Sequence, residues 1–180
     1  MSKNVLILSS SLRKNSNSDA LACEFFRGAK EAGHHVEKIS LAGKNIRFCI
    51  GCLTCQHTQK CVINDDSVEI TEKMKNADVI VLATPVYYYS VSGQLKTLLD
   101  RGNSLFSSDY RFRDIYLLAS AAEDEPETVK GTETAIQGWV DCFDKAVLKK
   151  TIFAGGVNDA GDIKGHPALK NAYETGRQLL

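Results

Sequence analysis

The sequence predicts an α/β protein built on a doubly wound, five-stranded parallel sheet with helices on both faces. Apolar runs recur along the 180 residues and alternate with segments whose apolar residues repeat every three or four positions. Runs such as Val79–Ala83 are apolar without interruption, which is typical of strands buried on both faces. Because no linker, repeat or low-complexity tract separates these elements, we expect residues 1–180 to form one domain, with a cysteine-rich insert at residues 44–66.

The expected strands share a short apolar run next to polar or glycine-rich residues. Taken along the chain, they are residues 4–8, 34–41, 78–85, 113–121 and 150–157.

The expected helices share apolar residues spaced by three or four, as Leu21, Phe25 and Ala29 show for the first, which Gly33 ends. Taken in order, they are residues 19–33, 66–77, 92–103, 132–149 and 166–180. Two segments fit neither pattern, the insert and the glycine-rich residues 155–165, and long irregular loops in a compact domain are usually functional or mobile.

Charge and hydropathy exclude several classes of protein. The chain has 22 basic and 22 acidic residues, whereas nucleic-acid binding requires a strongly basic surface, so we expect no nucleic-acid partner. The longest apolar run, Val79–Ala83, is far shorter than the roughly 20 residues of a membrane span, and we expect no membrane association. The first residues turn polar at Ser9 and lack the apolar centre of a signal peptide. We therefore expect a cytoplasmic protein whose six cysteines are ligands, reactive thiols or core residues rather than disulfides.

Hydroxyl, amide and cationic side chains follow the first expected strand and lead into a helix. Parallel sheets bind ligands at the carboxyl ends of their strands, and a helix N-terminus attracts anions. The stretch lacks the glycine patterns of a Walker loop and of a dinucleotide site, so it favours a phosphate monoester. Simple helix capping is the alternative. The candidate phosphate-binding residues are Ser9, Ser11, Arg13, Ser16, Asn17 and Ser18.

A second polar and aromatic segment follows the third expected strand. Pro85 and Tyr87–Tyr89 lie where that strand ends, beside the first strand in a doubly wound sheet. A flat aromatic ligand could stack there. The alternative is that the tyrosines pack at the rim of the core.

These two segments resemble the NADPH-dependent FMN reductase family of the flavodoxin-like fold. Residues 10–18, "SSLRKNSNS", are similar to the family's phosphate loop, with Ser10 in place of the usual glycine. Pro85 and Tyr87, followed by "LKTLLDR" at 95–101, are similar to its P-x-Y segment and its L-K-x-x-x-D-R helix. The resemblance implies a sheet of strand order 2-1-3-4-5.

The resemblance also implies which residues contact the flavin. Ser11, Arg13, Asn17 and Ser18 would hold the FMN phosphate. The ring would be lined by Pro85, Val86, Tyr87, Tyr88 and Ser90, with Ala121 and Ala122 at its other edge. Lys96, Asp100 and Arg101 are expected to be helix-surface charges or subunit contacts.

The activity that the resemblance implies is an FMN-dependent NAD(P)H oxidoreductase. NAD(P)H as co-substrate would reduce flavin N5, which carries the chemistry without a catalytic side chain. The acceptor would be a small quinone, nitro or azo compound or a flavin, and the protein a homodimer or homotetramer. One alternative is an electron carrier without its own substrate, either flavodoxin-like or an iron–sulfur flavoprotein, although zero net charge provides no steering field for a charged partner. The other is a regulatory or scaffold module without turnover.

Four cysteines form a C-x2-C-x2-C-x5-C array, consisting of Cys49, Cys52, Cys55 and Cys61. Iron–sulfur clusters use such spacing, and the array resembles that of the iron–sulfur flavoprotein branch, which implies a [4Fe–4S] cluster close to the flavin. Val62 stands where bacterial ferredoxins have proline, and reduced thiols on a loop near the flavin are the alternative. Cys23 and Cys142 are expected in the core.

Overall fold

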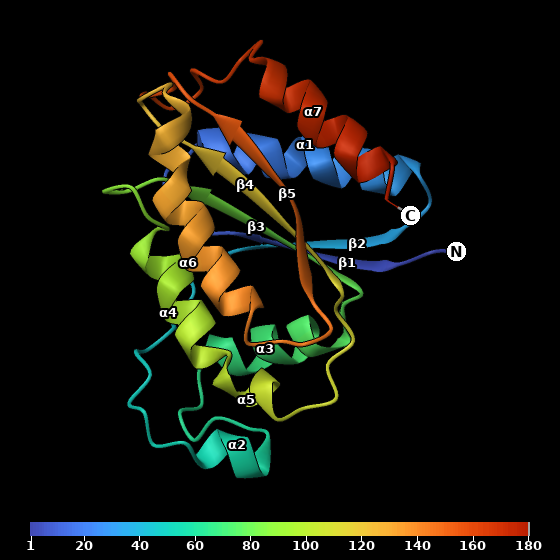
Figure 1. The fold of residues 1–180 in the computed structure, drawn as a ribbon, viewed down its shortest axis with the longest axis vertical. Helices are drawn as coiled ribbons and strands as arrows, with labels where there is room; N and C mark the ends of the chain where they lie inside the picture. Colours follow the sequence, from blue (N-terminus) through green and yellow to red (C-terminus); the bar gives the residue numbers. More distant parts are fainter. Residues whose placement is uncertain (180) are drawn as a thin grey trace.

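The computed structural model describes residues 1–179, which fold around one five-stranded parallel sheet (Figure 1). Neighbouring strands follow the order β2-β1-β3-β4-β5, and all four pairings are parallel. This confirms the predicted flavodoxin-like sheet and its strand order. The strands are β1 (Asn4–Ser9), β2 (His35–Ser40), β3 (Val79–Pro85), β4 (Asp114–Ser120) and β5 (Val147–Ala154).

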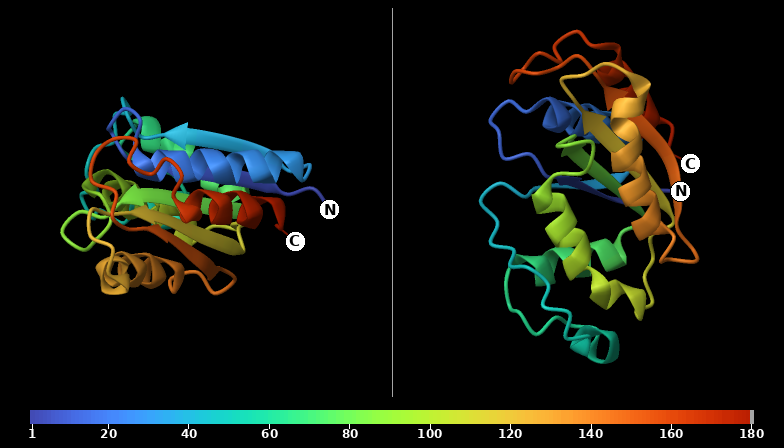
Figure 2. Two further views of the ribbon diagram at one scale, coloured as in Figure 1. Left: turned by 90° about the horizontal axis from the view of Figure 1, so that it is seen from above. Right: turned by 60° about the vertical axis from the view of Figure 1, so that its left-hand side comes forward.

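Helices cover both faces of the sheet (Figure 2). One face is covered by α1 (Asn17–Glu31) and α7 (Pro167–Arg177). The other is covered by α3 (Asp66–Asn76), α4 (Gly93–Arg101) and α6 (Lys130–Val140). The short elements are α2 (Thr54–Thr58), α5 (Asn103–Phe106) and the 3-10 helix η1 (Pro126–Val129). Within residues 1–179, no helix combines the length and the apolar character that crossing a bilayer requires.

The central strand β3 divides the core into two layers. All seven of its residues are buried, and successive side chains point to opposite faces of the sheet. Ile80 and Leu82 therefore pack with α3, α4 and α6, whereas Val79, Val81 and Ala83 pack with α1 and α7. The uninterrupted apolar run of β3 follows from burial on both sides.

Two glycines allow α1 and α7 to approach closely. A Cβ atom at Gly28 would lie 2.0 Å from the backbone oxygen of Tyr173, and one at Gly176 would lie 2.3 Å from that of Phe25. Real side chains cannot occupy such space, so each helix presents a bare stretch of backbone to the other. The two helices form a tight pair over one face of the sheet.

The structure corrects two helix predictions. The helix predicted at 132–149 ends at Val140; turns follow, and Val147 begins β5. The last helix ends at Arg177, and the predicted terminus, Leu180, lies outside the described residues. The prediction of Cys23 and Cys142 as core residues is wrong, since both are exposed.

Candidate flavin and cysteine sites

A polar pocket of about 210 Å³ lies at the carboxyl ends of the strands. We call it the strand-end pocket, and Ser120, Val157, Asn158 and Ala160 contribute to its lining. Nine of the thirteen residues expected to contact a flavin line it as well. These nine are Ser11, Arg13, Ser16, Asn17, Pro85, Val86, Tyr87, Ala121 and Ala122. Among the described residues that line it, Arg13 supplies a positive charge and none is a carboxylate, which suits an anionic ligand.

Ser10 fastens the loop after β1 to the neighbouring strand end. Its N–H and its hydroxyl both donate to the Ala83 carbonyl, at 2.9 and 3.0 Å. The Ser92 hydroxyl donates to Ser10 Oγ at 2.8 Å, and the same Ser92 oxygen caps the start of α4 by accepting from the Leu95 N–H at 3.4 Å. The serine that replaces the family's glycine therefore links β1, β3 and α4.

The start of α1 combines capping with the pocket lining. Ser16 is the N-cap residue, and its Oγ accepts from the Asp19 N–H at 3.4 Å and lies 3.1 Å from Ser18 Oγ. Ser9 and Ser18 are buried and do not line the strand-end pocket. Helix capping and ligand binding are thus compatible here, because the exposed N–H groups of α1 begin at the pocket.

Asn17 joins α1 to the glycine-rich loop at 155–165. Its Nδ2 donates to the Val157 and Asp159 carbonyls at 3.3 and 2.9 Å, and its Oδ1 accepts from the Gly161 and Ile163 N–H groups at 3.1 and 3.3 Å. The amide is fully occupied by these contacts. The loop therefore forms a wall of the pocket, a role that its irregular sequence indicated only as a functional or mobile segment.

Arg13 makes a second contact with that loop. Its Nη1 donates to the Asn158 carbonyl at 2.9 Å, while the side chain is otherwise exposed. A guanidinium has five N–H donors, so the remaining ones are free for a ligand anion. Sequence reasoning missed Ser120, Val157, Asn158 and Ala160, because their approach to the pocket depends on the ends of β4 and β5.

The tyrosines after β3 form a strained two-residue turn. Backbone hydrogen bonds join Tyr87 and Ser90 in both directions, at 3.0 and 3.1 Å, and Tyr88 and Tyr89 have φ angles of 47° and 59°. Such turns favour Asn-Gly, because left-handed backbone is costly for bulky residues. The Tyr89 hydroxyl donates to Glu123 at 2.9 Å, and this contact raises the pKa of Tyr89. Tyr88 is fully exposed, and neither Tyr88 nor Ser90 lines the pocket, although both were expected to contact the flavin ring.

All four cysteines of the array line a second cavity, of about 450 Å³, which we call the cysteine cavity. Its wall is completed by the end of α4, by α5 and by residues at the end of α6. Within residues 1–179, no three His, Cys, Asp or Glu side chains converge closely enough to hold a metal ion. A cluster would therefore require the loop that carries the array to close around it.

The surroundings of the array suit thiolate ligands. The Gly51 N–H donates to Cys49 Sγ at 3.4 Å, Asn103 Nδ2 donates to Cys55 Sγ at 3.5 Å, and Arg101 Nη2 donates to Cys61 Sγ at 3.3 Å. Hydrogen bonds from the Thr54 backbone and hydroxyl lower the pKa of the Cys52 thiol. All four are free thiols. Donors to sulfur stabilise the deprotonated form that binds iron, so this set fits an iron–sulfur cluster in its chemistry.

The two sites lie at opposite ends of α4. The helix begins at Gly93, directly after the tyrosine turn, and ends at Arg101 in the wall of the cysteine cavity. Nine helical residues span about 14 Å. Figure 1 likewise shows α2 at the lower end of the molecule, away from the arrowheads of β3 and β4. Within residues 1–179 the two cavities share no lining residue, so the array lies apart from the strand-end pocket, whereas the sequence had predicted a cluster close to the flavin.

A parallel sheet of this order, with a pocket at the carboxyl ends of its strands, defines the chain as a protein of the flavodoxin-like fold class. Its family is shown by sequence. The chain belongs to the NADPH-dependent FMN reductase family, whose sequence model matches residues 3–125.

Curated relatives include iron–sulfur flavoproteins of archaea. One from Methanocaldococcus jannaschii is 46% identical over 101 residues, covering 56% of this chain and 52% of the relative. One from Methanosarcina thermophila is 27% identical over 173 residues, covering 96% of this chain and 91% of the relative. The chain spans about half the length of the Methanocaldococcus relative, and 40% of a relative from Archaeoglobus fulgidus.

Solved structures share the fold at lower sequence identity. An NAD(P)H:quinone oxidoreductase from Methanothermobacter marburgensis superposes with a TM-score of 0.78 at 20% identity, covering 98% of this chain and 96% of that one. An azoreductase from Bacillus anthracis gives 0.74 at 15% identity, covering 99% and 100%. These similarities establish the fold.

Proposed function

We propose that the protein is an FMN-dependent oxidoreductase in which NAD(P)H reduces the flavin and a small acceptor reoxidises it. The observation that carries this proposal is that nine residues expected to contact a flavin, contributed by the segments after β1, β3 and β4, line one pocket. Family membership supports the same chemistry. The names of two solved structures of the same fold, a quinone oxidoreductase and an azoreductase, support quinones and azo compounds as candidate acceptors.

The donor set of the strand-end pocket fits a terminal phosphate. Ser11 and Ser16 supply hydroxyls, Arg13 supplies the guanidinium donors that Asn158 leaves free, and the N–H groups at the start of α1 complete the set. FMN, when bound, supplies hydride acceptance at N5. The segment from Pro85 to Tyr87 would form one wall against the ring. Ala121 and Ala122 have small side chains and would leave room at its edge.

Binding of FMN and of riboflavin by an Arg13→Ala variant tests the phosphate role. We expect FMN to bind about tenfold to a hundredfold more weakly, since a hydrogen bond to a charged group contributes about 1.5–3 kcal/mol. Riboflavin, which has no phosphate, should be unaffected. Lys14→Ala is the matched control, because Lys14 is an exposed neighbouring cation that does not line the pocket. Equal losses for both ligands would remove Arg13 from the phosphate site.

Anaerobic reduction tests the oxidoreductase role. We expect NADH or NADPH to bleach the flavin within a catalytic timescale, and a quinone, nitroaromatic or azo compound to restore its colour. If dithionite reduces the flavin but neither NADH nor NADPH does, the result would instead support an electron carrier.

We also propose that Cys49, Cys52, Cys55 and Cys61 hold a [4Fe–4S] cluster. The supporting observation is that four free thiols line one cavity and that Cys49, Cys55 and Cys61 each accept a hydrogen bond. The names of the archaeal relatives point the same way. The cluster would supply one-electron transfer.

Iron and acid-labile sulfide per chain, measured after oxygen-free purification, test the cluster. Cys52→Ser should lower both, whereas Cys23→Ser should not, because Cys23 lies on α1 outside the array. Flavin without iron in the wild-type preparation would leave only a thiol-bearing loop.

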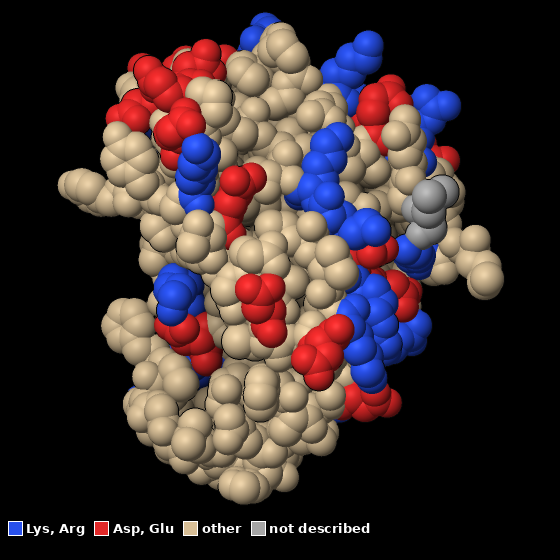
Figure 3. Space-filling model, in the orientation of Figure 1, with Lys and Arg blue, Asp and Glu red and all other residues tan. Residues whose placement is uncertain are grey.

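We further propose that the protein forms a homodimer or homotetramer. The insert and α5 expose an apolar surface, and Figure 3 shows few charged side chains over the lower end of the molecule, where they lie. Its large exposed residues are Phe48, Ile50, Leu53, Val62 and Phe106. Light scattering after size-exclusion chromatography measures the state directly, and a monomer would contradict the proposal.

A further inference from the structure

Arg101, the last residue of α4, is buried beneath the cysteine segment. Only 1% of the residue is exposed, which corrects the sequence prediction of a helix-surface charge. A buried cation is costly unless it is paired, and Arg101 Nη1 lies 2.6 Å from Asp65 Oδ2 with both side chains almost inaccessible to solvent. A pair buried in this way does not act as a surface charge, so its role must lie in the contacts that it makes inside the protein.

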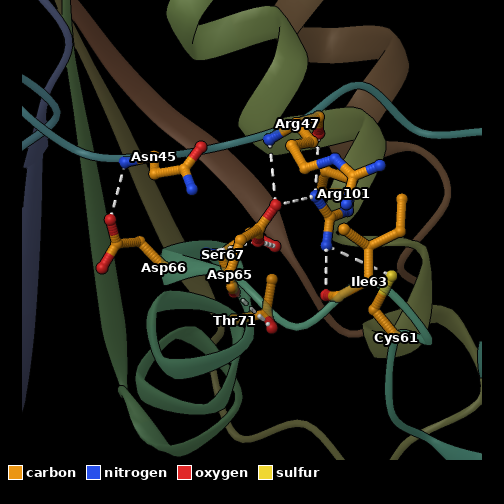
Figure 4. Close-up of polar contacts among 9 residues, drawn as sticks. All are labelled: Asn45, Arg47, Cys61, Ile63, Asp65, Asp66, Ser67, Thr71 and Arg101. Carbon is orange, nitrogen blue, oxygen red and sulfur yellow. Dashed lines mark hydrogen bonds and ion pairs between the residues drawn. The ribbon is translucent and has the colours of Figure 1, made fainter.

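The guanidinium joins both ends of the cysteine array (Figure 4). Nη1 donates to the Arg47 carbonyl at 2.8 Å, just before Cys49. Nη2 donates to Cys61 Sγ at 3.3 Å and to the Ile63 carbonyl at 2.9 Å. The fixed planar fork of arginine therefore holds the chain that enters the array and the chain that leaves it.

Asp65 anchors this assembly to a second helix. Its Oδ1 accepts from the Ser67 N–H at 3.0 Å and caps α3, while its Oδ2 accepts from the Arg47 N–H at 2.9 Å. Burial alone would raise the pKa of Asp65, but the hydrogen bonds from Arg101, Arg47 and Ser67 outweigh it and lower the pKa to about 2. The carboxylate is thus charged at neutral pH and holds Arg101 in place.

We propose that Arg101 is a positioning residue of the cysteine array, which fixes both ends of the array and sets the reduction potential of its cluster through the N–H···S bond to Cys61. This inference rests on the proposed cluster. Reduction adds negative charge to the cluster, and a donor to a ligand sulfur stabilises that added charge. Removing the donor therefore favours the oxidised form.

Asn103 provides a separate test of the donor effect. Its Nδ2 donates to Cys55 Sγ at 3.5 Å, and its side chain is only partly buried. It takes no part in the Asp65–Arg101 ion pair. Asn103→Leu removes an N–H···S bond at similar side-chain size and leaves the Arg101 assembly intact.

The experiment compares oxygen-free, cluster-loaded wild type with Arg101→Lys and Asn103→Leu. Redox titration followed by electron paramagnetic resonance gives the cluster potential, and iron analysis gives occupancy. An ammonium cannot reproduce the guanidinium fork, so we expect Arg101→Lys to lower the one-electron reduction constant about tenfold, a negative shift of about 59 mV. Asn103→Leu should shift the potential in the same direction. Lys96→Ala on the exposed face of α4 is the control and should not shift it.

The possible outcomes separate this inference from the proposed function. Folded, FMN-binding Arg101→Lys that has lost iron supports the positioning role. Cluster potentials and iron contents that match wild type in both variants overturn the inference while leaving the proposed cluster in place. Should Arg101→Lys fail to fold, Asn103→Leu decides the donor effect. Wild type without iron overturns the proposed cluster and the inference with it.

Discussion

The contact between Asn17 and the glycine-rich loop can be broken by one substitution, Asn17→Ala. The wild-type amide makes four hydrogen bonds to backbone groups of Val157, Asp159, Gly161 and Ile163. Alanine removes all four and leaves the helix start otherwise unchanged, because Ser16 is the capping residue.

The expected size of the effect follows from burial. Asp159 and Gly161 are exposed, so their backbone groups can bond to water once the amide is gone, whereas Val157 and Ile163 are buried. Each buried group left without a partner costs about 1–3 kcal/mol. We therefore expect the loop to be destabilised by about 3 kcal/mol, which corresponds to roughly a hundredfold change in its opening equilibrium.

Hydrogen exchange measures that opening. The amides of Gly161 and Ile163 should exchange about a hundredfold faster in Asn17→Ala, while those of β3 should be unaffected. Asn158→Ala is the matched control for the exchange measurement, since within residues 1–179 the hydrogen bond of that exposed side chain is to its neighbour Asp159. FMN should bind more weakly to Asn17→Ala because the loop is a wall of the pocket. Unchanged exchange of Gly161 and Ile163 would refute the reasoning.

Three further predictions concern acid stability and close backbone contacts. The pKa of Asp65 is about 2 in the folded chain against an ordinary 3.8, so its contribution of about 2 kcal/mol should be present above pH 4 and lost as the pH falls toward 2. Urea unfolding at pH 5 and pH 3 should show a smaller pH dependence in Asp65→Asn, and an equal dependence would contradict the assignment. Gly28→Ala should destabilise the fold by about 1–3 kcal/mol in thermal unfolding, because its Cβ would overlap an α7 carbonyl, whereas Gly138→Ala, with open space, should be neutral or stabilising. In Gly131→Ala, a Cβ 2.1 Å from the Tyr89 carbonyl should displace the tyrosine turn and weaken FMN binding in a fluorescence titration; wild-type affinity would show that the turn does not support the pocket.

The sheet was predictable because its strands coincide with short apolar runs in the sequence. β3 is buried along its whole length, and its sequence is correspondingly apolar from Val79 to Ala83. The end of α6 was not predictable in this way. Residues 141–146 contain neither glycine nor proline, and "AVLK" at 146–149 fits a helical apolar face as well as a strand. Pairing of β5 with β4 decides between them, and that contact is not local.

In the candidate sites too, features encoded by local sequence were predictable and features set by contacts distant in sequence were not. That Ser11, Arg13 and Pro85 line one pocket was predictable, because parallel strands bring their carboxyl ends together. Arg101 was misassigned because its partner, Asp65, lies 36 positions earlier, and helical spacing alone does not reveal a buried ion pair. The surface position of Cys142 likewise follows from the early end of α6.

The close pairing of α1 and α7 has a consequence for the order in which the nascent chain can fold. The apolar side of α1 is covered in part by a helix that begins at Pro167, 136 positions after α1 ends at Glu31. At about 5–20 residues per second, roughly 7–27 s pass between the synthesis of the two. During that interval the side of α1 that packs against α7 lacks its final cover, so the nascent chain exposes apolar surface there. Slower translation of the last fifty codons would lengthen that exposure, whereas the opposite face of the sheet, completed by α6, can close first.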